Sequence, residues 1–152
     1  VAAASPDDFY RLMAAHAFAS HDLCRMLVPQ MRESTRGDVV MISSIAAQSF
    51  GPTGGTYAAA KAAMEAVAYS LAKEERGNNI HVNIVAPGLI ETDMAEMMVK
   101  FQGRVKDSIS ELADDSPFGR LGYPEDIAGS VAFLCSERAS YITNQRITVA
   151  GS

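Results

Sequence analysis

The sequence lacks the features that mark several classes of protein. Its 13 Lys and Arg are outnumbered by 18 Asp and Glu, and the net charge of -5 is spread along the 152 residues. Nucleic-acid binding is therefore disfavoured, because it needs a basic surface that displaces counterions from phosphates. No apolar run approaches the roughly 20 residues that cross a bilayer, and the start VAAASPDD lacks the charged n-region of a signal peptide. We therefore expect a cytoplasmic protein that binds no nucleic acid and no membrane.

Cysteine is also scarce, since Cys24 and Cys135 are the only two. Both lie in apolar segments that favour helices, without a Cys or His neighbour at metal-ligand spacing, so we predict buried free thiols in a reducing compartment. His16 and His21 are five residues apart and do not share a helix face well, and His81 alternates within a predicted strand. We therefore predict no metal site.

What the sequence does contain is the composition of an ordinary globular protein, 48% hydrophobic and 20% charged. This composition and length predict one domain over residues 1–152. The first residue is Val rather than Met. We therefore expect the chain to be cut from a longer protein.

Helix and strand signals alternate along the chain. Ser5 is a good N-cap, followed by proline and two acids, and Gly77 is placed to be a left-handed C-cap. Helices are predicted over about 7–32, 56–75 and 124–136, and short apolar strands over 39–42, 80–85 and 146–149. The polar, Met-containing segment 91–116 is interpreted as a mobile excursion outside the core.

This alternation implies βαβ units with right-handed crossovers and a parallel sheet that has helices on both faces. Three strands are too few for a doubly wound sheet of the dinucleotide-binding type, which has about six. We therefore predict an α/β fold that is the carboxyl-terminal part of a doubly wound, parallel-sheet Rossmann-like domain, with its amino-terminal strands missing.

Tyr57 and Lys61 are the first candidates for chemistry. They are four residues apart in a predicted helix, so their side chains share a face near its amino terminus. An adjacent ammonium stabilises a phenolate and lets a phenol with a pKa of about 10 act as an acid or base near neutral pH. The spacing alone is also typical of a solvated helix face. Ser44 follows strand 39–42, at the sheet edge where open α/β folds place their ligand crevices.

Three stretches resemble the short-chain dehydrogenase/reductase family. VVMISSIAAQSFGPTGGTYAAAKAAMEAVAYSLAKE is similar to the family's serine strand, loop and Tyr-x-x-x-Lys helix. HVNIVAPGLIETDM is similar to its proline-glycine motif, and PFGRLGYPEDIAGSVAFLCSERASYITNQRITVAG to its last helix and strand. Several motifs in the family's order and spacing are far more specific than any one of them.

The resemblance implies an NAD(P)-dependent oxidoreductase that interconverts a carbonyl and a secondary alcohol by hydride transfer. Tyr57 would be the general acid and base. Lys61 would lower the pKa of Tyr57 and bind the nicotinamide ribose, and Ser44 would hold the substrate oxygen against the Tyr57 hydroxyl.

The resemblance also implies where the cofactor and the substrate bind. Pro87, Gly88, Ile90 and Thr92 would line the nicotinamide end of NAD or NADP. The partner would be a small-molecule carbonyl or alcohol, in a pocket formed largely by the segment from Met94 to Phe118.

Two residues depart from the family's pattern. The family's fourth catalytic residue is an Asn about thirteen residues before a Pro, and counting back from Pro29 reaches His16. His16 would either continue a proton relay towards Lys61 or pack as an ordinary helical residue, and the sequence leaves both open. Asn144 stands where the family commonly has Gly, which we expect to alter a turn rather than the chemistry.

A further departure is the absence of the family's glycine-rich phosphate-binding turn and of the residue that selects NAD or NADP. Residues 51–55 are glycine-rich but lack G-x-G-x-x-G spacing, so we predict a flexible loop there. The alternative function is therefore a catalytically inactive reductase-like fragment or assembly subunit. A hydrolase with Ser44 as nucleophile is disfavoured, because ISSIA lacks the G-x-S-x-G elbow.

Members of the family pair their long helices across two-fold axes, so the resemblance implies a homo-oligomer, either a dimer or a tetramer. The corresponding helices here are about 7–32 and 57–75. Four small side chains would let helices approach closely: Ala58, Ala59, Ala62 and Ala66.

Overall fold

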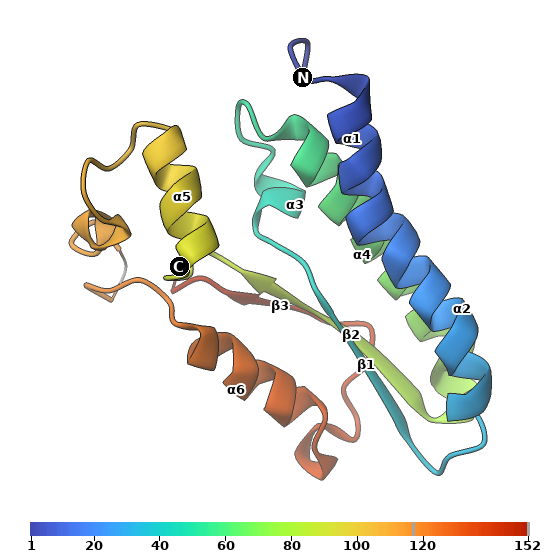
Figure 1. Ribbon diagram of the computed structural model, residues 1–152. Coiled ribbons are helices and arrows are strands. Elements are labelled where there is room, and N and C mark those ends of the chain that lie inside the picture. Colours follow the sequence, from blue (N-terminus) through green and yellow to red (C-terminus); the bar gives the residue numbers. More distant parts are fainter. Residues whose placement is uncertain (117, 152) are drawn as a thin grey trace.

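A three-stranded parallel sheet in the order β1-β2-β3 lies at the centre of the computed structural model, which describes residues 1–116 and 118–151. The strands are β1 (Gly37–Ile42), β2 (Ile80–Pro87) and β3 (Arg146–Val149). One face of the sheet is covered by α2 (Ala19–Met31) and α4 (Gly55–Glu75), and the other by α6 (Pro124–Leu134) (Figure 1). The predicted α/β fold with a parallel sheet is confirmed, and the three strands fall where the sequence placed them.

β2 is the central strand. It pairs with β1 from Gly37↔Ile80 to Ile42↔Val85 and with β3 from Ile84↔Arg146 to Pro87↔Val149. β2 is buried along nearly its whole length, which suits a continuous apolar run covered on both faces. Within residues 1–116 and 118–151, β1 pairs with β2 alone, so its other edge is open.

The predicted amino-terminal helix is continuous but changes its winding. Its first part is α1 (Pro6–Met13), where the Ser5 hydroxyl accepts the Asp7 N–H at 3.2 Å. The π-helical turn η1 (Ala14–Phe18) follows and leads directly into α2. A π-helical turn rotates the residues that follow it relative to an uninterrupted α-helix, and it often accompanies a functional site. The turn contains His16.

Helix α4 is rich in alanine, a strong helix former. It extends through the 3-10 turn η2 (Arg76–Asn78), and the left-handed residue after that turn is Asn79, with φ 55°. The prediction of Gly77 as the left-handed C-cap is therefore wrong, because the extra turn moves the cap two residues on. Asn tolerates this conformation. Ala58 is buried, so the prediction that it lies on an intersubunit surface is also wrong, whereas Ala59 and Ala66 are exposed.

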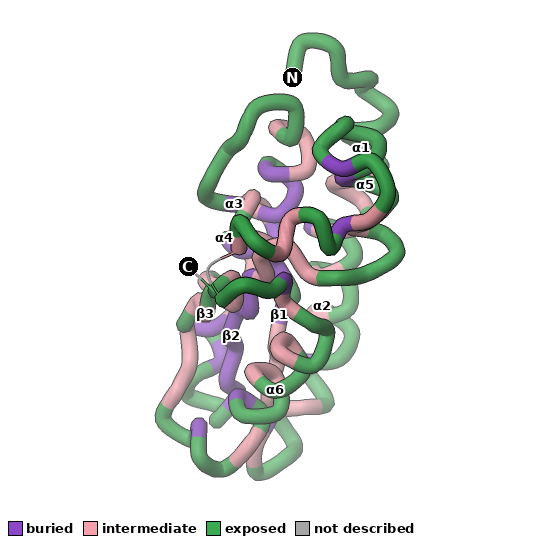
Figure 2. Tube along the Cα trace, turned by 90° about the vertical axis from the view of Figure 1, so that its left-hand side faces the viewer, coloured by how far each residue is buried: buried purple, intermediate pink, exposed green. Residues whose placement is uncertain are grey.

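The main core lies between the sheet and the helix pair α2 and α4. Figure 2 shows buried residues gathered along β2 and α4. Fully burying one aliphatic side chain stabilises a fold by about 1.5–3 kcal/mol. The cluster consists of Val28, Met41, Met64, Ala68, Ala72, Ile80, Val82 and Ile84.

The segment after β2 has a small core of its own. It contains α5 (Asp93–Phe101) and the 3-10 turn η3 (Ile109–Leu112). Val99, Val105 and Ile109 pack with Leu121 and are almost fully buried. The interpretation of 91–116 as an excursion without a core is therefore wrong, because its few apolar side chains are spaced so that they meet. Pro117, which falls in the predicted substrate segment, lies outside the described residues.

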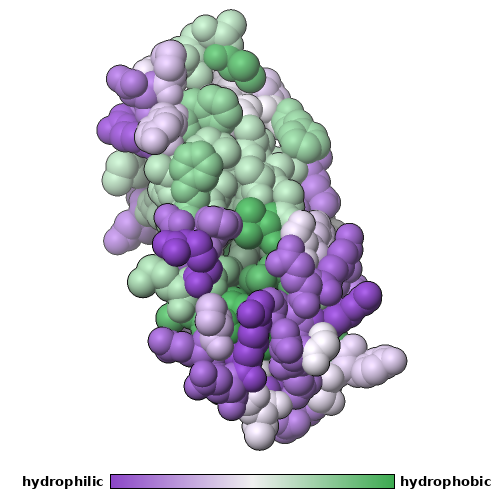
Figure 3. Space-filling model, turned by 90° about the vertical axis from the view of Figure 1, so that its right-hand side faces the viewer, coloured by the Kyte–Doolittle hydropathy of each residue, from purple (hydrophilic) through white to green (hydrophobic). Residues whose placement is uncertain are grey.

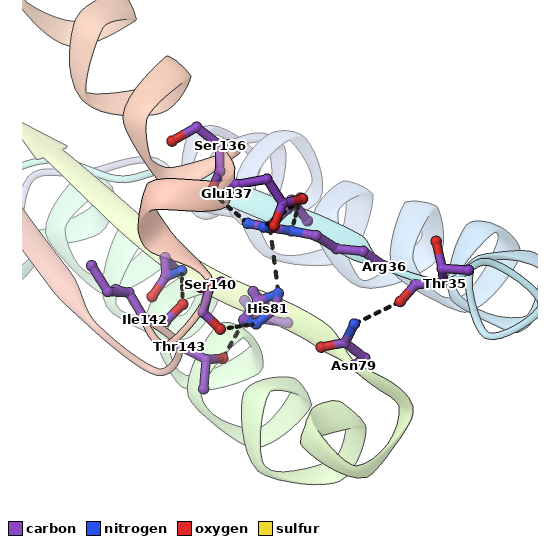
Figure 4. Close-up of polar contacts among 12 residues, drawn as sticks. Thr35, Arg36, Asn79, His81, Ser136, Glu137, Ser140, Ile142 and Thr143 are labelled. Carbon is purple, nitrogen blue, oxygen red and sulfur yellow. Dashed lines mark hydrogen bonds and ion pairs between the residues drawn. The ribbon is translucent and has the colours of Figure 1, made fainter.

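Polar contacts tie the loops together at the amino ends of the strands, opposite the candidate site (Figure 4). His81 Nε2 lies 3.0 Å from the Ser140 carbonyl oxygen, and Arg36 donates to Asp38 and to the Ser136 carbonyl. Nearby, Asn144 has a φ of 60°. Asn is tolerated in this left-handed conformation.

The two cysteines are free, but the prediction that both are buried is wrong. Cys135 is exposed because it caps the carboxyl end of α6, and Cys24 on α2 is half-buried against the core. Across the described residues, we find no helix of the length and apolarity that crossing a bilayer demands.

Candidate active site

The candidate catalytic residues meet at the carboxyl end of β1. Ser44 lies two residues beyond this strand and before the short helix α3 (Ala46–Ser49). Tyr57 is in the first turn of α4, and Lys61 follows one turn later. His16 approaches from η1, so residues that are far apart in the sequence reach one place.

Backbone pairing fixes the segment that carries Ser44. The Ser43 N–H donates to the Val85 carbonyl at 2.7 Å, and the Ile45 N–H donates to the Pro87 carbonyl at 3.0 Å. These bonds continue the parallel pairing of β1 and β2 past the end of β1. The Ser44 hydroxyl oxygen accepts the Ala46 N–H at 3.1 Å, and the Ser44 side chain lies near the Tyr57 hydroxyl.

Tyr57 is half-buried, and its burial sets its acidity. Burial raises the pKa of Tyr57, and the nearby Ser44 hydroxyl opposes this effect. The Lys61 ammonium, whose Nζ lies 5.8 Å from the Tyr57 ring centroid, was expected to lower this pKa, and that effect stays a prediction. A raised pKa keeps the hydroxyl protonated at neutral pH, as a proton donor to a substrate oxygen requires.

Lys61 is buried, and its ammonium donates to the Ile42 carbonyl at 2.9 Å. Burial lowers the pKa of Lys61, while the negative charge of Glu65 raises it. Lys61 therefore ties α4 to the carboxyl end of β1.

His16 packs against Tyr57. The two rings are edge to face, with centroids 5.5 Å apart and planes at 82°. Burial and, secondly, the charge of Lys61 lower the pKa of His16, so the imidazole is neutral at neutral pH. His16 thus contacts Tyr57 beside the candidate site, and its part in a proton relay stays a prediction. Within the described residues it makes no hydrogen bond that would continue a relay.

The loop after β2 lies beside the Ser44 segment. Gly88 is packed so tightly that an added Cβ would lie 2.7 Å from the Ala150 Cβ. Ile90 bridges to Gly122, and the exposed Thr92 caps α5 by accepting the Ala95 N–H at 3.2 Å. A cavity of about 390 Å³ opens here and is lined by, among others, Ile45, Gly88, Ile90 and Gly151.

A second cavity, of about 430 Å³, runs between α2 and β1 and contains His16 and Lys61 in its wall. The Ser44 and Tyr57 side chains line neither cavity. Ser44 and Tyr57 thus lie outside both hollows, at the carboxyl end of β1.

Three further residues near the site were missed by the sequence analysis: Ser43, Glu65 and Arg146. Ser43 and Glu65 are buried, Arg146 is largely buried, and the three side chains are joined by hydrogen bonds. Two signals could have found the charged pair, since Glu65 is four residues after Lys61 on the same helix and Arg146 is the charged residue of its strand.

Known proteins resemble this chain along nearly its whole length. A family model described as Enoyl-(Acyl carrier protein) reductase matches residues 1–151. The chain is 40% identical over 144 residues to an uncharacterized oxidoreductase, YmfI, of Bacillus subtilis, covering 92% of this chain and 55% of the relative. It is 37% identical to a 3-oxoacyl-acyl-carrier-protein reductase of Chlamydia pneumoniae, covering 97% of this chain and 57% of the relative.

Two solved structures have the same arrangement of elements. L-sorbose reductase from Gluconobacter frateurii, complexed with NADPH and L-sorbose, is 30% identical, with a TM-score of 0.90. A 7α-hydroxysteroid dehydrogenase, complexed with NADH and 7-oxo glycochenodeoxycholic acid, is 31% identical, with a TM-score of 0.86. The match covers 100% and 99% of this chain but only 60% and 57% of those chains. The chain thus spans little more than half the length of these relatives.

Proposed function

We propose that this chain, which belongs to the short-chain dehydrogenase/reductase family, carries the catalytic part of an NAD(P)-dependent oxidoreductase. The reaction would interconvert a carbonyl and a secondary alcohol. The observation that carries the proposal is the meeting of Ser44, Tyr57 and Lys61 at the carboxyl end of β1, with Lys61 Nζ 5.8 Å from the Tyr57 ring centroid.

In the direction of reduction, the Tyr57 hydroxyl would give its proton to the substrate oxygen. NADH or NADPH, when bound, would supply the hydride for the carbonyl carbon. The Ser44 hydroxyl would hold the same oxygen, so that both hydroxyls meet the negative charge as it develops. Lys61 would favour the tyrosinate that remains, since a cation in the same low-dielectric site stabilises an anion.

The residues around the loop after β2 fit the nicotinamide end of a cofactor. Pro87, Gly88, Ile90 and Thr92 lie beside the Ser44 segment, and the close approach of Gly88 to Ala150 leaves no room for a side chain. Thr92 has an exposed side chain that would reach a carboxamide. Lys61 would bind the nicotinamide ribose. The glycine-rich turn for the phosphates is missing from the 152 residues.

That missing turn favours a second candidate, a catalytically inactive reductase-like fragment or assembly subunit. Calorimetry with NADH and NADPH on the 152-residue chain separates the two. Micromolar binding would contradict the second candidate. An absence of binding would support the second candidate for this chain. Oxidoreductase activity would then require a protein that also contains the phosphate-binding turn.

The catalytic role of Tyr57 is tested by Tyr57→Phe in the longest protein that contains this chain. Activity is followed as loss of NADH or NADPH with L-sorbose, a 7-oxo bile acid and a 3-oxoacyl thioester as probes. We expect a loss of about a hundredfold or more, because the variant keeps the ring and loses the proton. Tyr69→Phe removes a hydroxyl from the same helix and should leave turnover unchanged. Full turnover in Tyr57→Phe would refute the proposed function.

We also propose that the protein is cytoplasmic and forms a homo-oligomer through its long helices. Exposed apolar side chains on α1, η1 and α2 support the second proposal, namely Phe9, Tyr10, Phe18, Leu23, Met26 and Leu27. Figure 3 views the side of the molecule where these helices lie and shows a broad hydrophobic surface there. Such a surface on a protein in water usually marks an interface.

A further inference from the structure

Glu65 and Arg146 form a buried ion pair directly behind the candidate site. Glu65 is only 4% exposed and lies on α4 one turn after Lys61. Its Oε1 accepts from Arg146 Nε at 2.9 Å and from Ser43 Oγ at 2.5 Å. Taking two charges out of water is costly, and replacing a buried pair by apolar residues is often neutral or stabilising. Stability alone is therefore a poor explanation for this pair.

The remaining donors of Arg146 hold the segment that carries Ser44. One terminal nitrogen donates to the Ser44 carbonyl at 3.0 Å, and the other donates to Thr148 Oγ1 at 2.7 Å. Since Lys61 donates to the Ile42 carbonyl, each of residues 42, 43 and 44 is bound by a charged side chain from α4 or β3. The place of the Ser44 hydroxyl relative to Tyr57 thus depends on these side chains.

Glu65 also acts on Lys61 through its charge. Burial lowers the pKa of Lys61, and Glu65 is the group that raises it. The other ionisable groups near this ammonium are His16 from η1 and Tyr57 from α4, while Arg146 from β3 faces Glu65 from the opposite side. A neutral group in place of Glu65 would leave the buried ammonium without its carboxylate.

We propose that Glu65 and Arg146 are a positioning pair, which holds Ser44 where its hydroxyl shares a substrate oxygen with Tyr57 and places a carboxylate one helical turn from the Lys61 ammonium. The pair touches no reacting atom and acts through Ser44 and Lys61. This inference rests on the proposed function.

The effect on Lys61 is tested by NMR titration of protein labelled at lysine Cε. The chain has four lysines, Lys61, Lys73, Lys100 and Lys106, so the Lys61 signal can be assigned with Lys61→Arg. We expect Glu65→Gln to lower the pKa of Lys61 by about one unit, the size of effect that a nearby opposite charge has. An unchanged Lys61 titration would overturn this half of the proposal, whether or not the protein shows turnover.

The control for this titration is Glu75→Gln. Glu75 is also on α4, is 2% exposed and also binds an arginine, Arg32, at 2.9 Å, but it lies in the last turn of the helix. This variant should leave the Lys61 titration and the turnover unchanged. It therefore separates a specific effect of Glu65 from the loss of any buried carboxylate.

The effect on Ser44 is tested by Arg146→Lys, which also serves if Glu65→Gln fails to fold. Lysine keeps a charge opposite Glu65 but cannot donate to Glu65, the Ser44 carbonyl and Thr148 together. We expect kcat of Arg146→Lys to fall about tenfold, because small misplacements of catalytic groups are costly. The loss of kcat at alkaline pH, which we assign to deprotonation of Lys61, should occur at the same pH as in the unmodified protein. In Glu65→Gln this loss should occur about one pH unit lower.

Unchanged kcat in Arg146→Lys would refute the positioning of Ser44. The failure of the proposed function is a different result, in which Tyr57→Phe retains turnover. The NMR titration still decides on Glu65 in that case.

Discussion

At the scale of single residues, burial decides what the ionisable side chains near Ser44 can do. Tyr57, Lys61 and His16 are all shifted towards their neutral forms, mainly by desolvation. For Lys61, the negative charge of Glu65 opposes this shift of the pKa. Such a site, with the Lys61 ammonium as a cation beside neutral side chains, would stabilise an anion that forms only during the reaction.

Gly88 gives a residue-scale prediction about packing. Gly88→Ala would place a Cβ 2.7 Å from the Ala150 Cβ and 3.0 Å from the Ala150 Cα, and backbone cannot move aside easily. We expect urea denaturation to show a loss of about 1–3 kcal/mol, typical of an overpacked site. Gly129→Ala is the control, since Gly129 lies within α6 with nothing within 4 Å. That variant should gain about 0.5–1 kcal/mol. Equal stability of Gly88→Ala and the unmodified chain would contradict the tight contact.

At the scale of elements, the sequence predicted most of the fold but not its fine structure. Strong periodic or continuous apolar patterns located the three strands and the helices α4 and α6. The π-helical turn η1 was missed, because its residues favour a helix of either winding. The core of segment 93–112 was missed since Val99, Val105 and Ile109 are isolated apolar residues that meet only after the chain turns.

Some residues of the candidate site could be predicted from the sequence, and others could not. Tyr57 and Lys61 follow from helix spacing, and Ser44 from its place after a strand. Arg146 is 81 residues from Glu65, so their pairing depends on β3 lying beside β2 and could not be read from local sequence. The effect of Lys61 on the pKa of Tyr57 stays a prediction, and the opposing effect of burial could not be read from helix spacing.

The turn η3 gives an element-scale prediction about pH. The Glu111 carboxylate accepts the N–H groups of Asp107 at 2.7 Å and Ser108 at 2.9 Å, which lowers its pKa from the ordinary 4.5. A lowered pKa contributes stability that is present above 4.5 and is lost as the pH falls through the folded-state value. In NMR spectra, these two amide signals should therefore titrate together below pH 4.5.

Glu111→Gln removes the titrating group, so both amide signals should become insensitive to acid. Glu91→Gln changes an exposed carboxyl of the same segment and should leave their titration as it was. Amide signals that titrate unchanged in Glu111→Gln would show that another carboxyl is responsible.

At the scale of the whole molecule, two surfaces differ from an ordinary protein exterior. One is the open edge of β1, where Ile42 is 42% exposed. An open apolar strand edge favours pairing with further strands. The other surface lies over the long helices, where a groove between α2 and α4 is lined by residues that include Arg25, Val28, Ala66 and Ser70. Small side chains on its α4 wall would let a second helix approach closely.

Ala66→Glu tests whether this groove is the interface of a homo-oligomer. Ala66 is exposed on α4, so the larger side chain fits on the isolated chain but would fill the space that a closely packed helix of a second copy needs. We expect light scattering to give a dimer or tetramer for the unmodified protein and a monomer for the variant. Ala128→Glu makes the same change on exposed α6, across the sheet, and should leave the assembly intact. A monomeric unmodified protein, or equal dissociation in both variants, would refute this interface.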